Sequence, residues 1–178
     1  MIGFLRCIGL LTVAVWFGAG VFLTLFAGPG FSSAEMQRLL GPKFYPYFSD
    51  AIAQIIVARY FRLQIICGII AIFHLFAEQL YFGRAPQKRW LSLLLALLAL
   101  SLLGGCFVQP KLKVWHDQRY DANATTQIRE TASRSFEVWH GISKAANLLM
   151  LTGLGFYLLR VGNPGESTRF IGSGKFRS

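Results

Sequence analysis

The run Trp90–Pro110, "WLSLLLALLALSLLGGCFVQP", constrains the fold of this chain more than any other feature of its sequence, because it contains no charged residue. As an α-helix rising about 1.5 Å per residue, it can cross the roughly 30 Å hydrocarbon core of a bilayer. The composition agrees, since 54% of all residues are hydrophobic and only 15% are charged. The run therefore predicts a membrane-spanning helix.

Three further apolar runs have membrane length. Cys7–Ala27 is uncharged, whereas Leu63–Phe82 and Gly141–Leu159 each contain a single charged residue. Together the runs predict an all-α integral membrane four-helix bundle in a single domain, residues 1–160. The predicted spans cover about residues 2–27, 60–82, 90–109 and 138–160. The basic remainder, residues 161–178, is expected to be a disordered tail.

Turn-forming residues predict the connection between the first two spans. "GPG" at Gly28–Gly30 is predicted to end the first span, which we interpret as an uncleaved helix rather than a signal peptide. Ser32 and Glu35 then match a capping box. They predict a short amphipathic helix that ends at Gly41-Pro42.

The polar part of the chain lies before the fourth span. The third span is predicted to end near Gln109-Pro110, because proline interrupts helices. Residues 111–136 mix both signs of charge. They are predicted to form a solvated or interface-lying pair of helices rather than a separate domain.

Basic residues gather at the ends of the apolar runs and give the chain a net charge of +10. There they would contact lipid headgroups and set the topology, so membrane lipids, and not nucleic acid, are the expected partners. Four spans place both termini and the connection between spans two and three on one side. Basic residues on the two sides nearly balance, but the dense turn "RAPQKR" and the basic tail favour cytoplasmic termini in a plasma (inner) membrane.

A polar stripe opens the fourth span. Its residues are spaced i, i+3, i+7 and i+10 and share one helical face: Glu137, His140, Lys144 and Asn147. Arg59 and Arg62 reach the same membrane level on the second span. Two interpretations stay open, because Lys144 can snorkel to the headgroups or the stripe can line an inward-facing pocket for an anionic headgroup, solute or ion. Asn147 favours the pocket, since it cannot snorkel and needs a partner on another helix.

Small residues four positions apart predict where the helices approach each other. Such pairs occur in three of the spans: Ala14 with Gly18, Gly20 with Thr24, Ser101 with Gly105, and Gly141 with Ala145. The leucine run of the third span is expected to face lipid.

No arrangement of residues points to catalysis or to a bound metal. His74 and His140 are expected roughly 15 Å apart along the membrane normal, too far for one iron or zinc ion. His116 lies outside the spans. We therefore expect no cofactor and no enzymatic activity, with a haem-binding redox subunit as a minor alternative.

The leading functional hypothesis is a non-enzymatic membrane protein that binds a lipid headgroup, an anionic solute or a membrane partner at the polar stripe. A homo-oligomer is compatible with this hypothesis. The alternative is a small transporter or channel subunit, which requires polar residues through the whole membrane thickness.

Several short motifs resemble the transmembrane protein 205-like family of four-helix multi-pass membrane proteins. They are "GAGVFLTLFAGPGF" leading into "FYPYF", then "VQPKLKVW", and then "FEVWHGISKAANLLML". The most specific part is the pattern Phe136, His140, Ser143 and Asn147. The resemblance implies the fold and topology but no settled activity. The chain departs from the family's commoner form in the longer stretch "SDAIAQIIVARYFRLQ", so the resemblance does not support a role for Arg59 or Arg62.

Overall fold

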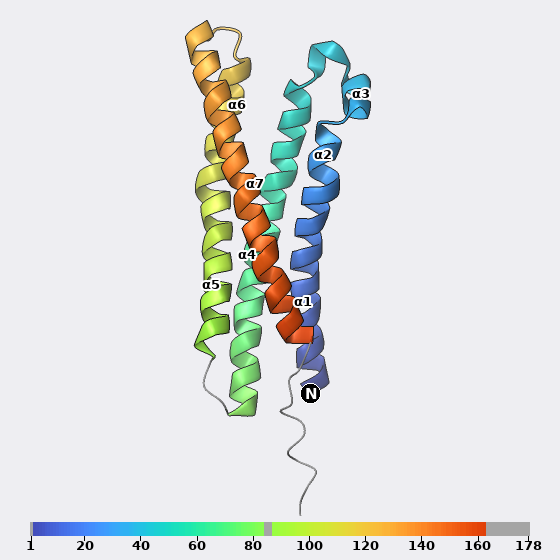
Figure 1. Ribbon diagram of the computed structural model, residues 1–178, viewed down its shortest axis with the longest axis vertical. Coiled ribbons are helices and arrows are strands. Elements are labelled where there is room, and N and C mark those ends of the chain that lie inside the picture. Colours follow the sequence, from blue (N-terminus) through green and yellow to red (C-terminus); the bar gives the residue numbers. More distant parts are fainter. Residues whose placement is uncertain (1, 84–86, 163–178) are drawn as a thin grey trace, which may run out of the picture.

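The computed structural model describes residues 2–83 and 87–162, and this part of the chain is helical with no strand (Figure 1). Four helical stretches are long and apolar enough to cross a membrane: Gly3–Phe31, Tyr47–Tyr81, Lys88–Tyr120 and Thr126–Gly162. They confirm the predicted all-α bundle of four membrane-length helices. Most of the predicted tail, from residue 163 onwards, lies outside the described residues.

The first span is longer than predicted. Helix α1 (Ile2–Phe22) continues through a π-helical segment, η1 (Leu23–Ala27), into the short helix α2 (Gly28–Phe31). The prediction that "GPG" ends this span is therefore wrong. Pro29 occupies the first turn of α2, directly after the π-helical segment. The preceding π-helical segment changes the hydrogen-bond register, with the Gly28 N–H donating to the Leu23 carbonyl.

The third span also contains a π-helical segment followed by a helix with proline in its first turn. Helix α5 (Lys88–Leu103) passes through the π-helical segment η2 (Gly104–Val108) into α6 (Gln109–Tyr120). Pro110 again follows a π-helical segment and lies in the first turn of the next helix, so the predicted end at Gln109-Pro110 is also wrong.

The short helix between the first two spans is present as α3 (Ala34–Phe44). Its N-cap is Ser33, whose hydroxyl accepts from the Met36 N–H at 3.1 Å, so the predicted capping box starts one residue too early. The helical backbone is interrupted at Gly41, as predicted. There φ is 70° and ψ is 167°, a conformation that residues with a side chain rarely adopt.

Replacing Gly41 with alanine is expected to lower the free energy of unfolding by about 1–2 kcal/mol, because the alanine Cβ opposes this backbone conformation. Thermal unfolding in detergent, followed by tryptophan fluorescence, measures the change. Gly141→Ala is the matched control, since no atom lies within 4 Å of a Cβ added there and no positive φ is present. Equal melting temperatures for the two variants would contradict the expected strain at Gly41.

The other two long helices complete the bundle. Helix α4 (Tyr47–Phe82) ends at Gly83 in the left-handed conformation, and α7 (Thr126–Gly162) is the last helix described. The polar segment 111–136 forms a pair of helices as predicted, separated by residues 121–125, and the two helices continue spans three and four directly. Helix α6 and the first turns of α7 pack side by side beyond the apolar part of the bundle (Figure 1).

The core forms where α1 packs against α4 and α7, and where α5 packs against α4. Its fully buried members include Trp16, Leu75, Leu94 and Leu154. The start of α1, the end of α4, the start of α5 and the end of α7 all lie at one end of the bundle (Figure 1). The structure thus has the predicted up-and-down arrangement of spans.

Only two of the four predicted small-residue pairs have a member buried between helices. Gly20 and Ser101 are buried between helices. No atom lies within 4 Å of a Cβ added at Gly18 or Gly141. In the leucine run, Leu94 and Leu97 are buried, so that run does not face lipid throughout.

Candidate functional site: a polar junction and its cationic rim

Asn147 lies at a polar junction of three helices. The Tyr60 hydroxyl on α4 donates to Asn147 Oδ1 at 2.9 Å. The amide of Asn147 donates to Thr24 Oγ1 in η1 at 2.6 Å, and that hydroxyl donates to the Gly20 carbonyl at 2.7 Å. Asn147 therefore has the interhelical partners that its place in an apolar helix requires.

Gly20 allows the helices to come this close. A Cβ at this position would lie 2.9 Å from the Tyr60 hydroxyl oxygen and 2.7 Å from Leu151 Cδ2. Tyr60 is buried, with 8% of its surface exposed. The hydrogen bonds of the junction are therefore sheltered from competing water.

A second polar layer lies one turn further along α4. Gln64 Nε2 donates to the Met150 sulfur at 2.8 Å, and Ser101 Oγ donates to the Leu97 carbonyl at 2.9 Å. Gln64 Oε1 is buried and has no hydrogen-bond partner among the described residues. The inward face of α4 thus carries polar groups at two successive levels.

The charged residues predicted for the site point elsewhere. Arg59, Arg62, Lys144 and Glu137 are all exposed on the surface of the bundle. Within the described part of the chain no hydrogen bond or ion pair involves any of these four residues. They do not converge with Asn147 on one inward pocket.

The cations nevertheless share one level with the junction. Arg59 and Arg62 flank Tyr60 on α4, and Tyr60 is bonded to Asn147. Lys144 lies about 4.5 Å from Asn147 along α7. We call Arg59, Arg62 and Lys144 the cationic rim.

His140 is exposed, and its ring stacks on Phe136 with centroids 5.8 Å apart and an interplanar angle of 8°. Both residues lie on α7 one turn apart, so the contact follows from the i, i+4 spacing. No hydrogen bond from His140 to another described residue is present. The structure therefore places His140 above the junction and not within it.

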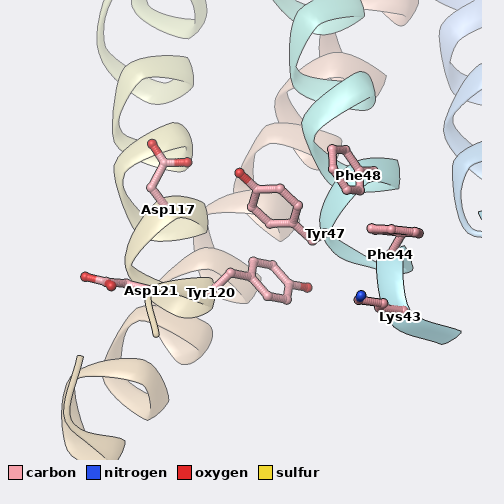
Figure 2. Close-up of a pocket in the computed structure, with 7 residues that line it drawn as sticks. All are labelled: Lys43, Phe44, Tyr47, Phe48, Asp117, Tyr120 and Asp121. Carbon is pink, nitrogen blue, oxygen red and sulfur yellow. The ribbon is translucent and has the colours of Figure 1, made fainter. Parts of the chain in front are cut away.

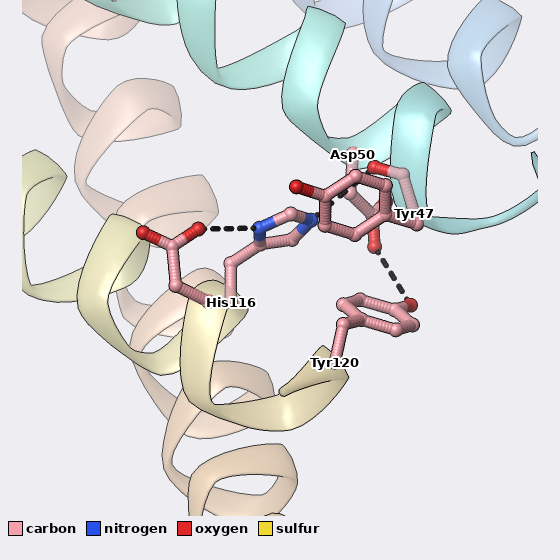
Figure 3. A network of polar contacts seen from close by, with 5 residues as sticks. Tyr47, Asp50, His116 and Tyr120 are labelled. Atoms are coloured by element: carbon pink, nitrogen blue, oxygen red, sulfur yellow. Dashed lines mark hydrogen bonds and ion pairs between the residues drawn. The ribbon is translucent and has the colours of Figure 1, made fainter. Parts of the chain in front are cut away.

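Beyond the rim, α4 and α6 are joined by an aromatic cluster that the sequence analysis did not find (Figure 3). His116 is buried, with Nε2 lying 3.3 Å from the Tyr47 carbonyl oxygen and Nδ1 3.3 Å from Asp117 Oδ1. Both partners are acceptors, so a neutral ring donates to only one of them at a time. The Tyr120 hydroxyl donates to Asp50 Oδ2 at 3.4 Å. The only signal in the sequence is the helical spacing of His116 with Tyr120 and of Tyr47 with Asp50.

The opposite end of the bundle holds a third set of polar contacts. His74 Nε2 donates to the Leu5 carbonyl at 2.8 Å, which joins α4 to α1. Arg160 Nη2 lies 3.5 Å from Glu78 Oε2, and the guanidinium lies over the ring of Trp90. The three histidines therefore occupy separate sites, and no cluster of three metal-ligating side chains is found among the described residues.

Four membrane-length helices, a buried interhelical polar junction and exposed cations at its level define a multi-pass membrane protein. Residues 11–121 match a family described as a domain of unknown function (DUF4149), and the chain belongs to that family. No curated protein and no solved structure matches the chain. The matched residues include Thr24 and Tyr60 but end before α7, which carries Asn147.

Proposed function

We propose that this chain is a non-enzymatic membrane protein that binds anionic lipid headgroups at the cationic rim. The observation that supports this proposal is that Arg59, Arg62 and Lys144 are exposed at one level of the bundle. None of the three forms a hydrogen bond or an ion pair with another described residue. Anionic headgroups attract basic residues at the membrane surface by about 1 kcal/mol for each Lys or Arg.

The spacing of charged residues along α7 supports a position of the rim at the edge of the hydrocarbon. Exposed apolar side chains on α4 occur on both sides of the rim: Ile52, Ile55 and Ile56 before Arg59, and Ile66, Ile69 and Phe73 after Arg62. Along α7 the distance from Lys144 to Arg160 is about 24 Å, close to the thickness of the hydrocarbon core once the long side chains extend outwards. The rim and Arg160 would then lie at the two membrane surfaces.

The packing below the junction favours this proposal over a transporter or channel subunit. Such a subunit needs polar groups through the membrane thickness. On α4, Gln64 and His74 are separated by the buried residues Cys67 and Ala71, which pack in one core cluster with Trp16. This apolar plug separates the two polar ends within a single copy of the chain.

Replacing both Arg59 and Arg62 with glutamine is expected to weaken binding of short-chain phosphatidylglycerol by about 2 kcal/mol, or roughly 30-fold, because two headgroup contacts are lost. Titration of the purified full chain in a neutral detergent measures the affinity. Wild-type protein should bind phosphatidylglycerol more tightly than phosphatidylcholine.

The double variant Arg129→Gln, Arg134→Gln is the matched control, because both residues are exposed on α7 and Arg134 lies about 15 Å from Lys144 along the helix. It removes the same charge and should bind phosphatidylglycerol nearly as wild type does. The proposal fails if the two double variants lose affinity equally, or if wild-type protein shows no preference for the anionic lipid.

We also infer that the chain is related to the transmembrane protein 205-like family. This inference rests on Phe136, His140, Ser143 and Asn147 in α7. It is tested by whether members of that family have residues equivalent to Thr24 and Tyr60 whenever they have the asparagine.

We further propose cytoplasmic termini in a plasma (inner) membrane. A reporter fused after Ser178 that is active only on the outer side would overturn this orientation.

A further inference from the structure

A cavity of about 450 Å³ opens beyond the cationic rim, between the end of α6 and the junction of α3 with α4 (Figure 2). Its lining combines aromatic rings with both signs of charge: Lys43, Phe44, Tyr47, Phe48, Asp117, Tyr120 and Asp121. Tyr47 lies about 18 Å from Arg59 along α4, so this cavity is separate from the proposed lipid contacts at the rim.

The aromatic rings form a wall of edges and faces. Phe44 and Phe48 meet at 63°, Phe48 and Tyr47 at 79°, and Tyr47 and Tyr120 at 79°, with centroids 5.1–5.5 Å apart. Rings set nearly at right angles expose electron-rich faces in different directions. Such walls attract organic cations, above all alkylated ammonium groups.

The charges lie at opposite ends of this wall. Asp117 on α6 and Asp121 directly after it lie on one side, with the Asp121 carboxylate pointing away from the rings, and Lys43 lies at the α3 end on the other (Figure 2). The Lys43 ammonium is 5.6 Å from the centroid of Phe44, and the Arg119 guanidinium is 5.3 Å from that of Tyr120. These two faces are already covered by cations of the chain. Asp117 Oδ1 lies 3.3 Å from His116 Nδ1, and Asp121 Oδ1 accepts from the Asn123 N–H at 2.9 Å. The positions left for a ligand cation are therefore the side of Tyr47 away from His116 and the second oxygen of each carboxylate.

Contacts with His116 and Asp50 fix two of the rings of this wall in place. The ring of Tyr47 stacks on the buried ring of His116 with centroids 5.1 Å apart, and Tyr120 is fixed through its hydrogen bond to Asp50. These contacts fix the positions of the Tyr47 and Tyr120 rings, so binding orders few additional side chains. Preorganisation of this kind raises affinity.

We propose that this cavity binds a zwitterion carrying an ammonium group and a phosphate, with the chemistry of phosphocholine or phosphoethanolamine. The ammonium lies against Tyr47 beside the Asp117 carboxylate, and Asp121 adds a second negative charge on the same side of the cavity. The phosphate is paired with the Lys43 ammonium. Neither charge alone satisfies both ends of the cavity, so a compound with both charges is preferred over choline or inorganic phosphate.

The test is titration calorimetry of the purified full chain in dodecyl maltoside with phosphocholine, choline and inorganic phosphate as probes. Saturable binding of phosphocholine is expected, with an affinity at least about tenfold above that of either fragment. The double variant Asp117→Asn, Asp121→Asn should lose at least about tenfold in phosphocholine affinity while keeping its weak phosphate binding. Lys43→Gln should show the converse, losing phosphate and keeping choline.

Glu130→Gln is the control, because this carboxylate is exposed on α7 outside the cavity and its loss should change nothing. Every variant is first compared with wild type by thermal unfolding, and only variants that melt as wild type does are titrated. The proposal is overturned if wild-type protein shows no saturable phosphocholine binding. It is also overturned if the Asp117, Asp121 double variant and the Lys43 variant both bind phosphocholine as tightly as Glu130→Gln.

A second arm distinguishes the source of the ligand. The chain is placed in nanodiscs of phosphatidylcholine or of phosphatidylglycerol and titrated with soluble phosphocholine. Competition only in phosphatidylcholine assigns the site to a lipid headgroup, whereas equal affinity in both assigns it to a soluble ligand. Since this readout does not involve Arg59 or Arg62, it stands or falls independently of anionic-lipid binding at the rim.

Discussion

Replacing Asn147 with leucine is expected to lower the free energy of unfolding of the bundle by about 1–3 kcal/mol, because it removes two interhelical hydrogen bonds at once. The Tyr60 hydroxyl would lose its acceptor in a buried position. The Thr24 hydroxyl can still donate within its own helix to Gly20, so the loss should fall mainly on the contact between α4 and α7. Unfolding in mixed dodecyl maltoside and dodecyl sulfate micelles measures the change.

A double-mutant cycle separates this coupling from a general effect of substitution. Tyr60→Phe removes the same hydrogen bond from the other side, so its cost should largely disappear when Asn147 is already leucine. Thr152→Leu is the matched control, since this hydroxyl is exposed on α7 and bonds only to the Leu148 carbonyl of its own helix. If the costs at positions 60 and 147 add in full, the two residues are not energetically coupled and the junction does not stabilise the bundle.

The junction is only partly predictable from the sequence. The depth of Asn147 in an apolar helix and its short side chain predicted a partner on another helix. The partners, Tyr60 and Thr24, could not be identified, because each belongs to a different span and nothing in the sequence sets how two spans are rotated against each other. Gly20 and Thr24 form a predicted packing pair, and the contacts of Gly20 confirm this prediction.

The rotation of α7 against its neighbours, which the sequence does not set, also explains why most of the polar stripe lies outside the bundle. Helical periodicity places Glu137, His140, Lys144 and Asn147 on one face of α7, and this holds. The residues of α7 that face the interior of the bundle, however, include Met150, Leu154 and Tyr157. They lie on a neighbouring face of the helix rather than on that of the stripe. Asn147 lies at the boundary of the two faces and reaches its partners, while the longer charged side chains remain outside.

The spans themselves were predictable because membrane length and apolar composition are local properties. The ends of the spans are less predictable, because proline commonly ends a helix. At Pro29 and Pro110 a π-helical segment precedes the proline and absorbs the missing hydrogen bond, so each helix continues. Such a segment depends on the tertiary setting and has no short-range signature.

One close contact of α1 with α4 is likewise absent from the predicted packing pairs. It occurs at Gly9, which is buried directly against the ring of His74. A Cβ added at Gly9 would lie 2.5 Å from Nε2 and 2.9 Å from Nδ1 of that ring, closer than real contacts allow. The same imidazole donates to the Leu5 carbonyl at 2.8 Å, so the ring cannot move aside without losing that bond.

Replacing Gly9 with leucine is therefore expected to destabilise the bundle by about 3 kcal/mol, through overpacking and the loss of the His74 hydrogen bond. Gly18→Leu on the same helix is the control, because no atom lies within 4 Å of a Cβ added there. Unfolding in mixed micelles should leave Gly18→Leu near wild type. The double variant Gly9→Leu, His74→Ala should recover part of the lost stability, because the leucine then fills the space left by the imidazole. A double variant no more stable than Gly9→Leu alone would show that the clash with His74 is not the cause, and that α1 meets α4 differently at this level.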